Sequence, residues 1–210
     1  MAIDFYTNPM SRGQIVRWML EEVGEPYTQH IVDYSVMGDD AYGAVNPMRK
    51  VPAIVHDGKL VTECAAICAY LADVFPEAGL RPRDDEKADY YRWLFFAAGP
   101  VEQAVTNHAN GWDPAPERRR MFGYGDYDRT LETLAGHLAL NDYVCGSRFT
   151  AADVYVGSQV LWGMQFGTMT KLPPLEAYGE RLAGRDAYKR GKEIDGKLIA
   201  EMQAKQEANA

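Results

Sequence analysis

Apolar residues near the start of the chain change their spacing in a way that predicts alternating strands and helices. Residues 3–6 and 27–32 are short runs rich in aromatic and β-branched residues, which are typical of strands. Between them, residues 11–23 carry apolar side chains at intervals of three and four, which is the spacing of one helix face. The first third of the chain therefore opens with a βαβ unit.

A hairpin and a helix follow this unit. Asp57-Gly58 separates the apolar runs 53–56 and 59–61, and glycine accepts the positive φ that a tight hairpin turn requires. A helical pattern of about 12 residues begins after Glu63. With an irregular, short-helical stretch at 36–45, the order becomes βαβαββα, which predicts a mixed, thioredoxin-like sheet.

Beyond residue 75 the pattern is helical. The segment 76–84 is rich in proline and charge, as linkers are. We expect three parts: a thioredoxin-like domain at 1–75, a linker at 76–84 and an all-α helical bundle at 85–210. Within the bundle, the spacing predicts a helix over 85–107 with a kink at Gly99-Pro100, a second over 117–140, and further helices after Cys145-Gly146 and after Leu172-Pro173-Pro174. The polar tail from 197 is expected to fray.

Thr150 and Asp153 form a near capping box at the start of one of these helices, with aspartate in place of the usual glutamate. We interpret both side chains as structural caps without a chemical role.

Composition narrows the possible partners. The 210 residues carry a net charge of -8, which disfavours binding to nucleic acid or to an anionic membrane. The start of the chain lacks a signal peptide and no run is long enough to span a membrane, so we expect a cytoplasmic protein. Three cysteines without a C-x-x-C motif and four scattered histidines predict neither a disulfide framework nor a metal site.

Residues 45–72 contain the strongest candidate binding site. Val51-Pro52 precedes a strand, where a cis peptide is favourable and the backbone of Val51 is expected to pair with an extended ligand. The helix after Glu63 would direct free N–H groups at a carboxylate, and Glu63 itself would hold an ammonium group. These features together fit glutathione.

The same residues give the chain a resemblance to cytosolic glutathione transferases of the bacterial, theta-like serine type, and the resemblance extends over nearly the whole chain. It implies that Val51-Pro52 is a cis peptide, that Val51 and Pro52 bind the cysteinyl part of glutathione, and that Glu63 and the next residue bind its γ-glutamyl end. Cys64 stands where serine is usual, and cysteine is the weaker donor. Lys50 is placed to meet the glycyl carboxylate, with Arg49 as a substitute.

Two hydroxyls are candidates for activating the glutathione thiol, because only the thiolate is nucleophilic. Ser11 lies where the first helix should begin, at the place of the theta-like catalytic serine. Tyr6 ends the first strand, near the place of the catalytic tyrosine in other classes. We favour Ser11, although a simple N-cap would explain it, as a half-buried strand aromatic would explain Tyr6. Arg12 and Arg17 are candidate electrostatic helpers, and Arg17 also fits a structural ion pair.

An apolar second substrate is expected between the two domains, where clefts commonly form. Aromatic and Met-rich stretches could line it, and the side chains that we expect there are Met10, Phe96, Gln103, Trp112, Trp162 and Phe166.

The resulting expectation is a glutathione S-transferase that attacks an apolar electrophile, with glutathione as co-substrate and no metal. The resemblance further implies a role in detoxification and a homodimer. Two alternatives stay open: a weakly active or non-catalytic glutathione- or ligand-binding protein of the same fold, and a glutathione-dependent thiol reductase or peroxidase. Cys64 is the residue that motivates both.

Overall fold

The structure, a computed structural model, describes residues 2–208, which form two compact units. One unit combines the residues up to Ala78 with those from Gly184 onward, and the other is Gly79–Ala183. The chain thus leaves the first unit once and returns to it near its end.

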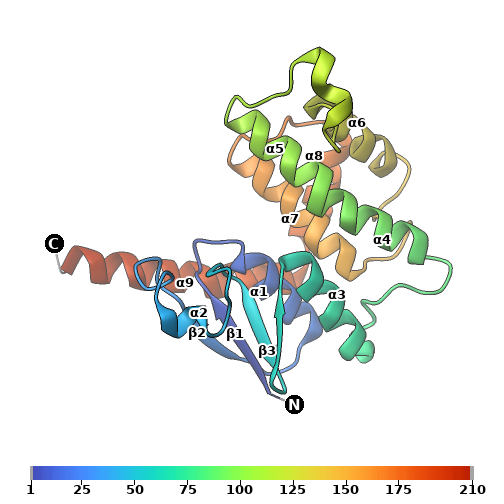
Figure 1. The fold of residues 1–210 in the computed structure, drawn as a ribbon. Helices are drawn as coiled ribbons and strands as arrows, with labels where there is room; N and C mark the ends of the chain where they lie inside the picture. Colours follow the sequence, from blue (N-terminus) through green and yellow to red (C-terminus); the bar gives the residue numbers. More distant parts are fainter. Residues whose placement is uncertain (1, 209–210) are drawn as a thin grey trace. The chain divides into compact units, whose positions relative to one another are not determined.

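The first unit has the predicted order βαβαββα (Figure 1). Its elements are β1 (Ile3–Thr7), α1 (Gly13–Val23), β2 (Thr28–Ile31), α2 (Asp40–Gly43), β3 (Ala53–His56), β4 (Lys59–Thr62) and α3 (Cys64–Val74). The strand order in the sheet is β2-β1-β3-β4. Only β1 and β2 run parallel, while β3 is antiparallel to both of its neighbours, so the sheet is mixed and thioredoxin-like as predicted.

Side-chain alternation explains how this sheet is covered. In β1, Ile3 and Phe5 are buried while Asp4 and Tyr6 are only half-buried. The apolar face of α1 packs against the buried side, and α1 ends at Gly24, whose φ of 79° closes the helix in the left-handed conformation.

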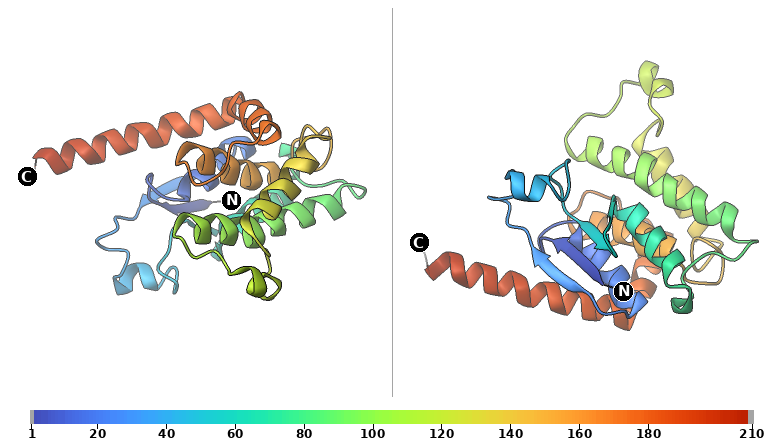
Figure 2. Two further views of the ribbon diagram at one scale, coloured as in Figure 1. Left: turned by 90° about the horizontal axis from the view of Figure 1, so that it is seen from above. Right: turned by 60° about the horizontal axis from the view of Figure 1, so that its bottom comes forward.

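Helix α9 (Asp186–Ala208) completes the first unit. It packs along α1, and Figure 2 shows the two helices side by side. The sequence analysis placed these residues with the helical domain and expected the tail to fray from residue 197. Instead α9 continues to Ala208, and its first turns pack against α1 through buried residues at positions 187, 191 and 195.

The second unit is helical, as predicted. Its elements are α4 (Lys87–Phe96), a π-helical segment (Ala97–Val101), α5 (Glu102–Ala109), a 3-10 helix (Pro116–Met121), α6 (Tyr127–Leu138), α7 (Ala151–Gln165) and α8 (Pro173–Ala183). The irregularity expected at Gly99-Pro100 takes the form of the π-helical segment, because Pro100 has no N–H for a regular helical bond.

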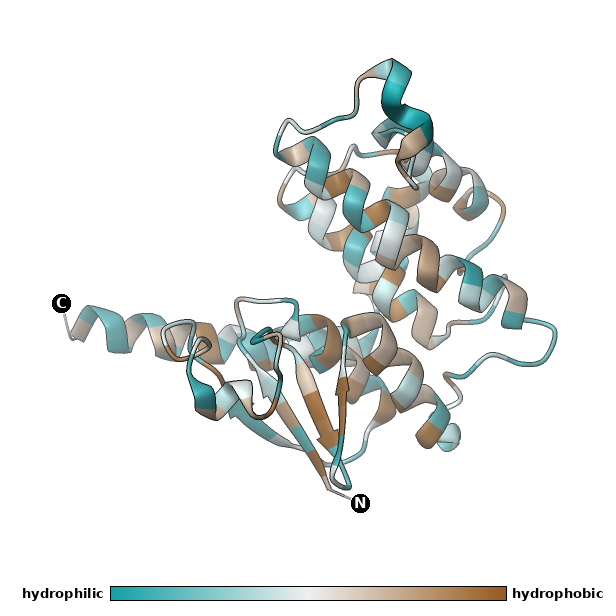
Figure 3. Ribbon diagram, in the orientation of Figure 1, coloured by the Kyte–Doolittle hydropathy of each residue, from teal (hydrophilic) through white to brown (hydrophobic). Residues whose placement is uncertain are grey.

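The helix predicted over 117–140 was wrong in its first part. Residues 117–121 lie in the 3-10 helix, and α6 begins only at Tyr127. Gly125 has a φ of 73°, which a continuous helix does not accommodate, and Asp126 then caps α6 by accepting the N–H of Arg129. Figure 3 shows the 3-10 helix mostly in teal, the colour of hydrophilic residues, whereas β3 is brown. The charged residues of the 3-10 helix therefore resemble a solvated α-helix face in the sequence.

The capping box at the start of α7 is confirmed. The Asp153 carboxylate accepts the backbone N–H of Thr150, and also the N–H of Val144 and the hydroxyl of Tyr178. Burial nevertheless raises the pKa of Asp153 to about 6. Among residues 2–208, no helix is long and apolar enough to cross a membrane.

Candidate functional site

Strand register brings three separate segments to one end of the sheet. Tyr6 pairs with Ala53, and Ala53 pairs with Thr62 on its other side. The loop that follows β1, the residues that precede β3 and the residues that follow β4 therefore meet at this end. We call these segments, residues 8–12, 49–52 and 63–64, the sheet-end site.

Two helix N-termini lie at the sheet-end site. Helix α1 begins at Gly13 and α3 begins at Cys64. The Cys64 thiol donates to the carbonyl of Arg12 at a distance of 3.7 Å, so the two helix starts are in direct contact. Their first-turn N–H groups and partial positive charges favour an anionic ligand here.

Ser11 is half-buried in the loop that enters α1. Its hydroxyl donates to the carbonyl oxygen of Asn8 at 2.6 Å and accepts the N–H of Gly13 at 2.9 Å. The acceptor side of the oxygen is thus directed at the helix. To stabilise a bound thiolate, the hydroxyl must turn its proton from the Asn8 carbonyl to the sulfur.

Two buried asparagines, each followed by proline, shape the loops of the site. Asn8 donates its amide N–H to the carbonyl of Val32 and accepts the N–H of Met10. Asn46 repeats this arrangement, donating to the carbonyl of Lys50 and accepting the N–H of Met48. The sequence analysis missed both residues. The Asn-Pro pairs in the sequence are turn signals that would have located them.

The segment that enters β3 is held by its carbonyl groups. The Val51–Pro52 peptide is cis. The carbonyl of Lys50 accepts from Asn46 and from the hydroxyl of Tyr42, whose pKa burial raises to about 12. Because β3 lies between β1 and β4, Val51 is not on an edge strand. Its backbone instead lies beyond the last paired residues of the sheet, next to the exposed side chain of Lys50.

Glu63 has a φ of 66°, in the left-handed region that non-glycine residues rarely occupy. Its side chain is exposed at the start of α3. Residues with such backbone strain cluster at ligand sites. Arg49 also has a positive φ, of 53°, but its guanidinium pairs with Asp40 at 2.8 Å, which directs its charge away from the site.

Comparison with known proteins agrees with this geometry. Residues 10–74 match the model of the glutathione S-transferase N-terminal domain. The chain is 31% identical to the glutathione S-transferase GstA of Escherichia coli O157:H7 over 176 residues, which cover 79% of this chain and 85% of GstA. It is 30% identical to the protein LigF of Sphingobium sp. strain SYK-6, over 81% of this chain and 84% of LigF. The chain belongs to the glutathione S-transferase family.

A solved structure of a relative supports the same assignment. The sphingomonad glutathione S-transferase complexed with glutathione superimposes with a TM-score of 0.74 at 26% identity, covering 92% of this chain and 98% of that one.

Tyr6, the other candidate hydrogen-bond donor to the glutathione thiolate, lies on the opposite sheet face from Phe5. Its ring stacks on His30 with a centroid distance of 4.6 Å and lies 6.1 Å from the ring of Tyr42. His30 in turn pairs with Asp4 at 2.7 Å. The ring is therefore fixed in an aromatic cluster, whereas Ser11 lies in the loop at the sheet end.

The two arginines considered as helpers have different environments. Arg12 is exposed at the start of α1. Arg17 is only 1% exposed, pairs with Asp195 of α9 at 3.2 Å and donates to the hydroxyl of Tyr27. We interpret Arg17 as a structural residue of the first unit.

The second thiol of α3 is inert. Cys68 is fully buried, and burial raises its pKa well above the ordinary value of 9.0, with the nearby Cys64 adding to the shift. A thiolate at this position is strongly disfavoured, so Cys68 does not provide a nucleophile.

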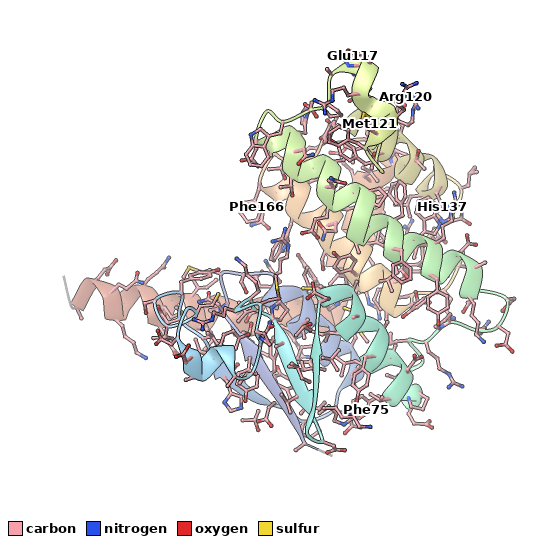
Figure 4. All side chains as sticks on the ribbon, in the orientation of Figure 1. Phe75, Glu117, Arg120, Met121, His137 and Phe166 are labelled. Atoms are coloured by element: carbon pink, nitrogen blue, oxygen red, sulfur yellow. The ribbon has the colours of Figure 1, made fainter. Side chains whose placement is uncertain are left out.

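The residues expected to line the electrophile pocket are distributed over both units. Met10 is 45% exposed in the loop that carries Ser11. In the helical unit, Trp162 and Phe166 form an edge-to-face pair with centroids 6.2 Å apart, and Figure 4 labels Phe166 at the end of α7. The other three members have separate environments: Phe96 packs on Trp93, Gln103 is exposed on α5, and Trp112 is 64% exposed after α5.

The described part of the chain contains no candidate metal-binding cluster. No group of three or more histidine, cysteine, aspartate or glutamate side chains is arranged there to hold a metal ion.

Proposed function

We propose that this chain is a glutathione transferase that binds glutathione at the sheet-end site and activates its thiol for attack on an apolar electrophile. The observation that carries the proposal is the meeting of the α1 and α3 N-termini with the Lys50–Pro52 segment at one end of the sheet. Two positive helix ends beside unpaired strand backbone suit an anionic peptide.

Each part of glutathione has a matching group in this proposal. The backbone of Val51, ahead of Pro52, pairs with the cysteinyl residue of the ligand. Glu63 binds the α-amino group and Cys64, with the N-terminus of α3, binds the γ-glutamyl carboxylate. The Lys50 ammonium binds the glycyl carboxylate.

Ser11 is the proposed thiolate donor. Lowering the thiol pKa by two units from about 8.5 requires about 2.7 kcal/mol. A hydrogen bond to a charged acceptor contributes about 1.5–3 kcal/mol, against about 1 kcal/mol for the neutral bond to Asn8 that Ser11 gives up. Ser11 and the α1 N-terminus together can therefore supply the shift. Tyr6 would have to lower the thiol pKa while its ring stays packed against His30 and Tyr42.

The proposal extends to assembly as a homodimer. Tyr91 and Phe95 lie one turn apart on α4 and are 47% and 69% exposed, which makes that helix face a candidate contact surface. Sedimentation equilibrium distinguishes the proposed dimer from a monomer.

A second candidate function is glutathione binding with little turnover. It is favoured by the hydrogen bond that already engages the Ser11 proton and by the weak donor Cys64 in the γ-glutamyl position. The two functions share the binding site and differ in the state of the bound thiol.

Calorimetric titration with glutathione, followed by turnover assays with apolar electrophiles, tests the proposal. Glu63→Gln should weaken binding about tenfold or more, because it removes the charge that faces the ammonium group. Ser11→Ala should retain binding and lose turnover, while the surface variant Ser35→Ala serves as a control. Full turnover in Ser11→Ala, together with loss of turnover in Tyr6→Phe, would make Tyr6 the donor. Absence of binding at millimolar glutathione would refute both functions.

A further inference from the structure

Helix α9 lies close to α1 at Gly191. A Cβ placed on Gly191 would lie 3.5 Å from the backbone of Trp18 and 3.3 Å from the side chain of Arg17. The absence of a side chain lets the two helix backbones come close. Lys192, directly after Gly191, and Asp195, one turn further on, both contact α1.

These two side chains contact α1 differently. Asp195 pairs with the buried Arg17. Lys192 is half-buried and donates to the side-chain oxygen of Gln14 at 3.0 Å. Burial lowers the pKa of Lys192, while the Asp195 carboxylate opposes that shift.

Gln14 connects Lys192 to the loop of the sheet-end site by hydrogen bonds. Its amide N–H donates to the carbonyl of Pro9 at 2.5 Å, while its oxygen is occupied by Lys192. The N–H of the same Pro9–Met10 peptide is held by the Asn8 side chain at 2.9 Å. The peptide is thus clamped on both sides, directly beside the Asn8 carbonyl that orients the Ser11 hydroxyl.

We propose that Lys192 and Gln14 are positioning residues for the glutathione chemistry, forming a relay from α9 through Gln14 to the Pro9 carbonyl that fixes the loop carrying Ser11. Gln14 uses both its donor and its acceptor in this relay, so reversing its amide would break both contacts: the NH2 group would face the Lys192 ammonium and the oxygen would face the Pro9 carbonyl. Lys192 selects the orientation in which the N–H faces Pro9. Helix α9 therefore contributes to the site through Gln14.

Four variants separate this relay from a general effect on stability. Lys192→Met removes the donor and keeps the apolar stem. Gln14→Glu keeps an acceptor for Lys192 but replaces the N–H that faces Pro9 with a second oxygen. Lys192→Arg restores a cationic donor. Lys197→Met is the matched control, since Lys197 pairs with Glu193 on the exposed side of the same helix.

The first readout needs no ligand. Hydrogen exchange of the amides of Met10, Ser11 and Gly13 should speed up about three- to tenfold in Lys192→Met and Gln14→Glu, as expected for the loss of one hydrogen bond. Lys197→Met should match the unmodified chain, and Lys192→Arg should recover at least half of the change. Unchanged exchange in both relay variants overturns the inference.

The second readout is the pKa of bound glutathione, from its thiolate absorbance. It should rise by about half a unit to one unit in the two relay variants, with kcat reduced about three- to tenfold. The glutathione Kd, measured at a pH below the bound pKa, should change less than about twofold. Since the inference rests on the proposed function, the unmodified chain is measured first. If its bound thiol shows no pKa depression, the proposed function fails. If the depression is present and the relay variants keep it, losing only thermal stability, the positioning role fails while the function stands.

Discussion

Replacing Asp195 by alanine should leave the Arg17 guanidinium buried without its counter-charge. The two side chains are 1% and 3% exposed, and their closest atoms, Nε and Oδ1, are 3.2 Å apart. Removing one partner of a buried pair typically costs about 3–5 kcal/mol, because the remaining charge cannot be solvated.

Three features of the pair place this variant at the lower end of that range. Arg17 keeps its hydrogen bonds to Tyr27 and Gln29, each 2.7 Å long, and it still lies over the Phe5 ring. Among the described residues, Oδ2 of Asp195 has no hydrogen-bond partner. Burial also raises the pKa of Asp195 against the opposing effects of Arg17 and Lys192, so the carboxylate is itself destabilised by its environment. We therefore expect Asp195→Ala to cost about 3 kcal/mol.

Urea unfolding measures this cost, with the exposed pair Lys197–Glu193 on the same helix as reference. Lys197→Ala should change the free energy of unfolding by less than about 0.5 kcal/mol. Asp195→Asn, which keeps an acceptor for Arg17 but not the charge, should fall between the two. A cost below about 1 kcal/mol for Asp195→Ala would refute the view that this buried pair anchors α9 to α1.

Three further predictions concern pH and packing. Burial raises the pKa of Asp153 from 3.8 to about 6, so the folded chain binds this proton more tightly than the unfolded chain. The proton therefore stabilises the fold fully below pH 3.8, and this stabilisation is lost as the pH rises through 6. In Asp153→Asn, the free energy of unfolding from urea titrations should no longer fall with pH over this range. The hydrogen bond from Arg148 shifts Glu86 in the opposite direction and lowers its pKa from 4.5 to about 2. The ionised Glu86 therefore stabilises the fold above pH 4.5, and this stabilisation is lost as the pH falls through 2. In Glu86→Gln, the free energy of unfolding should no longer show this loss at low pH. Gly13→Ala would place a Cβ 1.9 Å from the buried Thr7 hydroxyl, which should cost about 1–3 kcal/mol in thermal unfolding, and the added change Thr7→Ala should recover part of it.

The architecture of the first unit could be predicted because its signals are local. Strand and helix spacing differ, and Asp57-Gly58 marks the hairpin, so the order βαβαββα followed from residues near one another in the chain. The same order of strands also predicts that the loop after β1, the entry to β3 and the start of α3 meet at one end of the sheet. The error at 117–126 had a local cause as well, since the charged residues there resemble a solvated helix face and the positive φ of Gly125 is not visible in the pattern.

The contribution of α9 could not be predicted in this way. Arg17 and Asp195 are 178 residues apart, and neither hydrophobic spacing nor a motif connects them. The same separation hides the contact between Lys192 and Gln14. Asn8 and Asn46 are an intermediate case: their Asn-Pro pairs signal turns, but that the side chains are buried and hold the site loops depends on the packing around them.

A pH titration of the thiolate absorbance of bound glutathione, in the unmodified chain and in Ser11→Ala, tests the central claim most directly. We expect the bound thiol to titrate at about 6 to 7 in the unmodified chain, roughly two units below its free value, and to return toward about 8.5 when Ser11 is replaced. A bound thiol that keeps its free pKa, or a depressed pKa that Ser11→Ala leaves unchanged, would contradict the assignment of Ser11 as the thiolate donor.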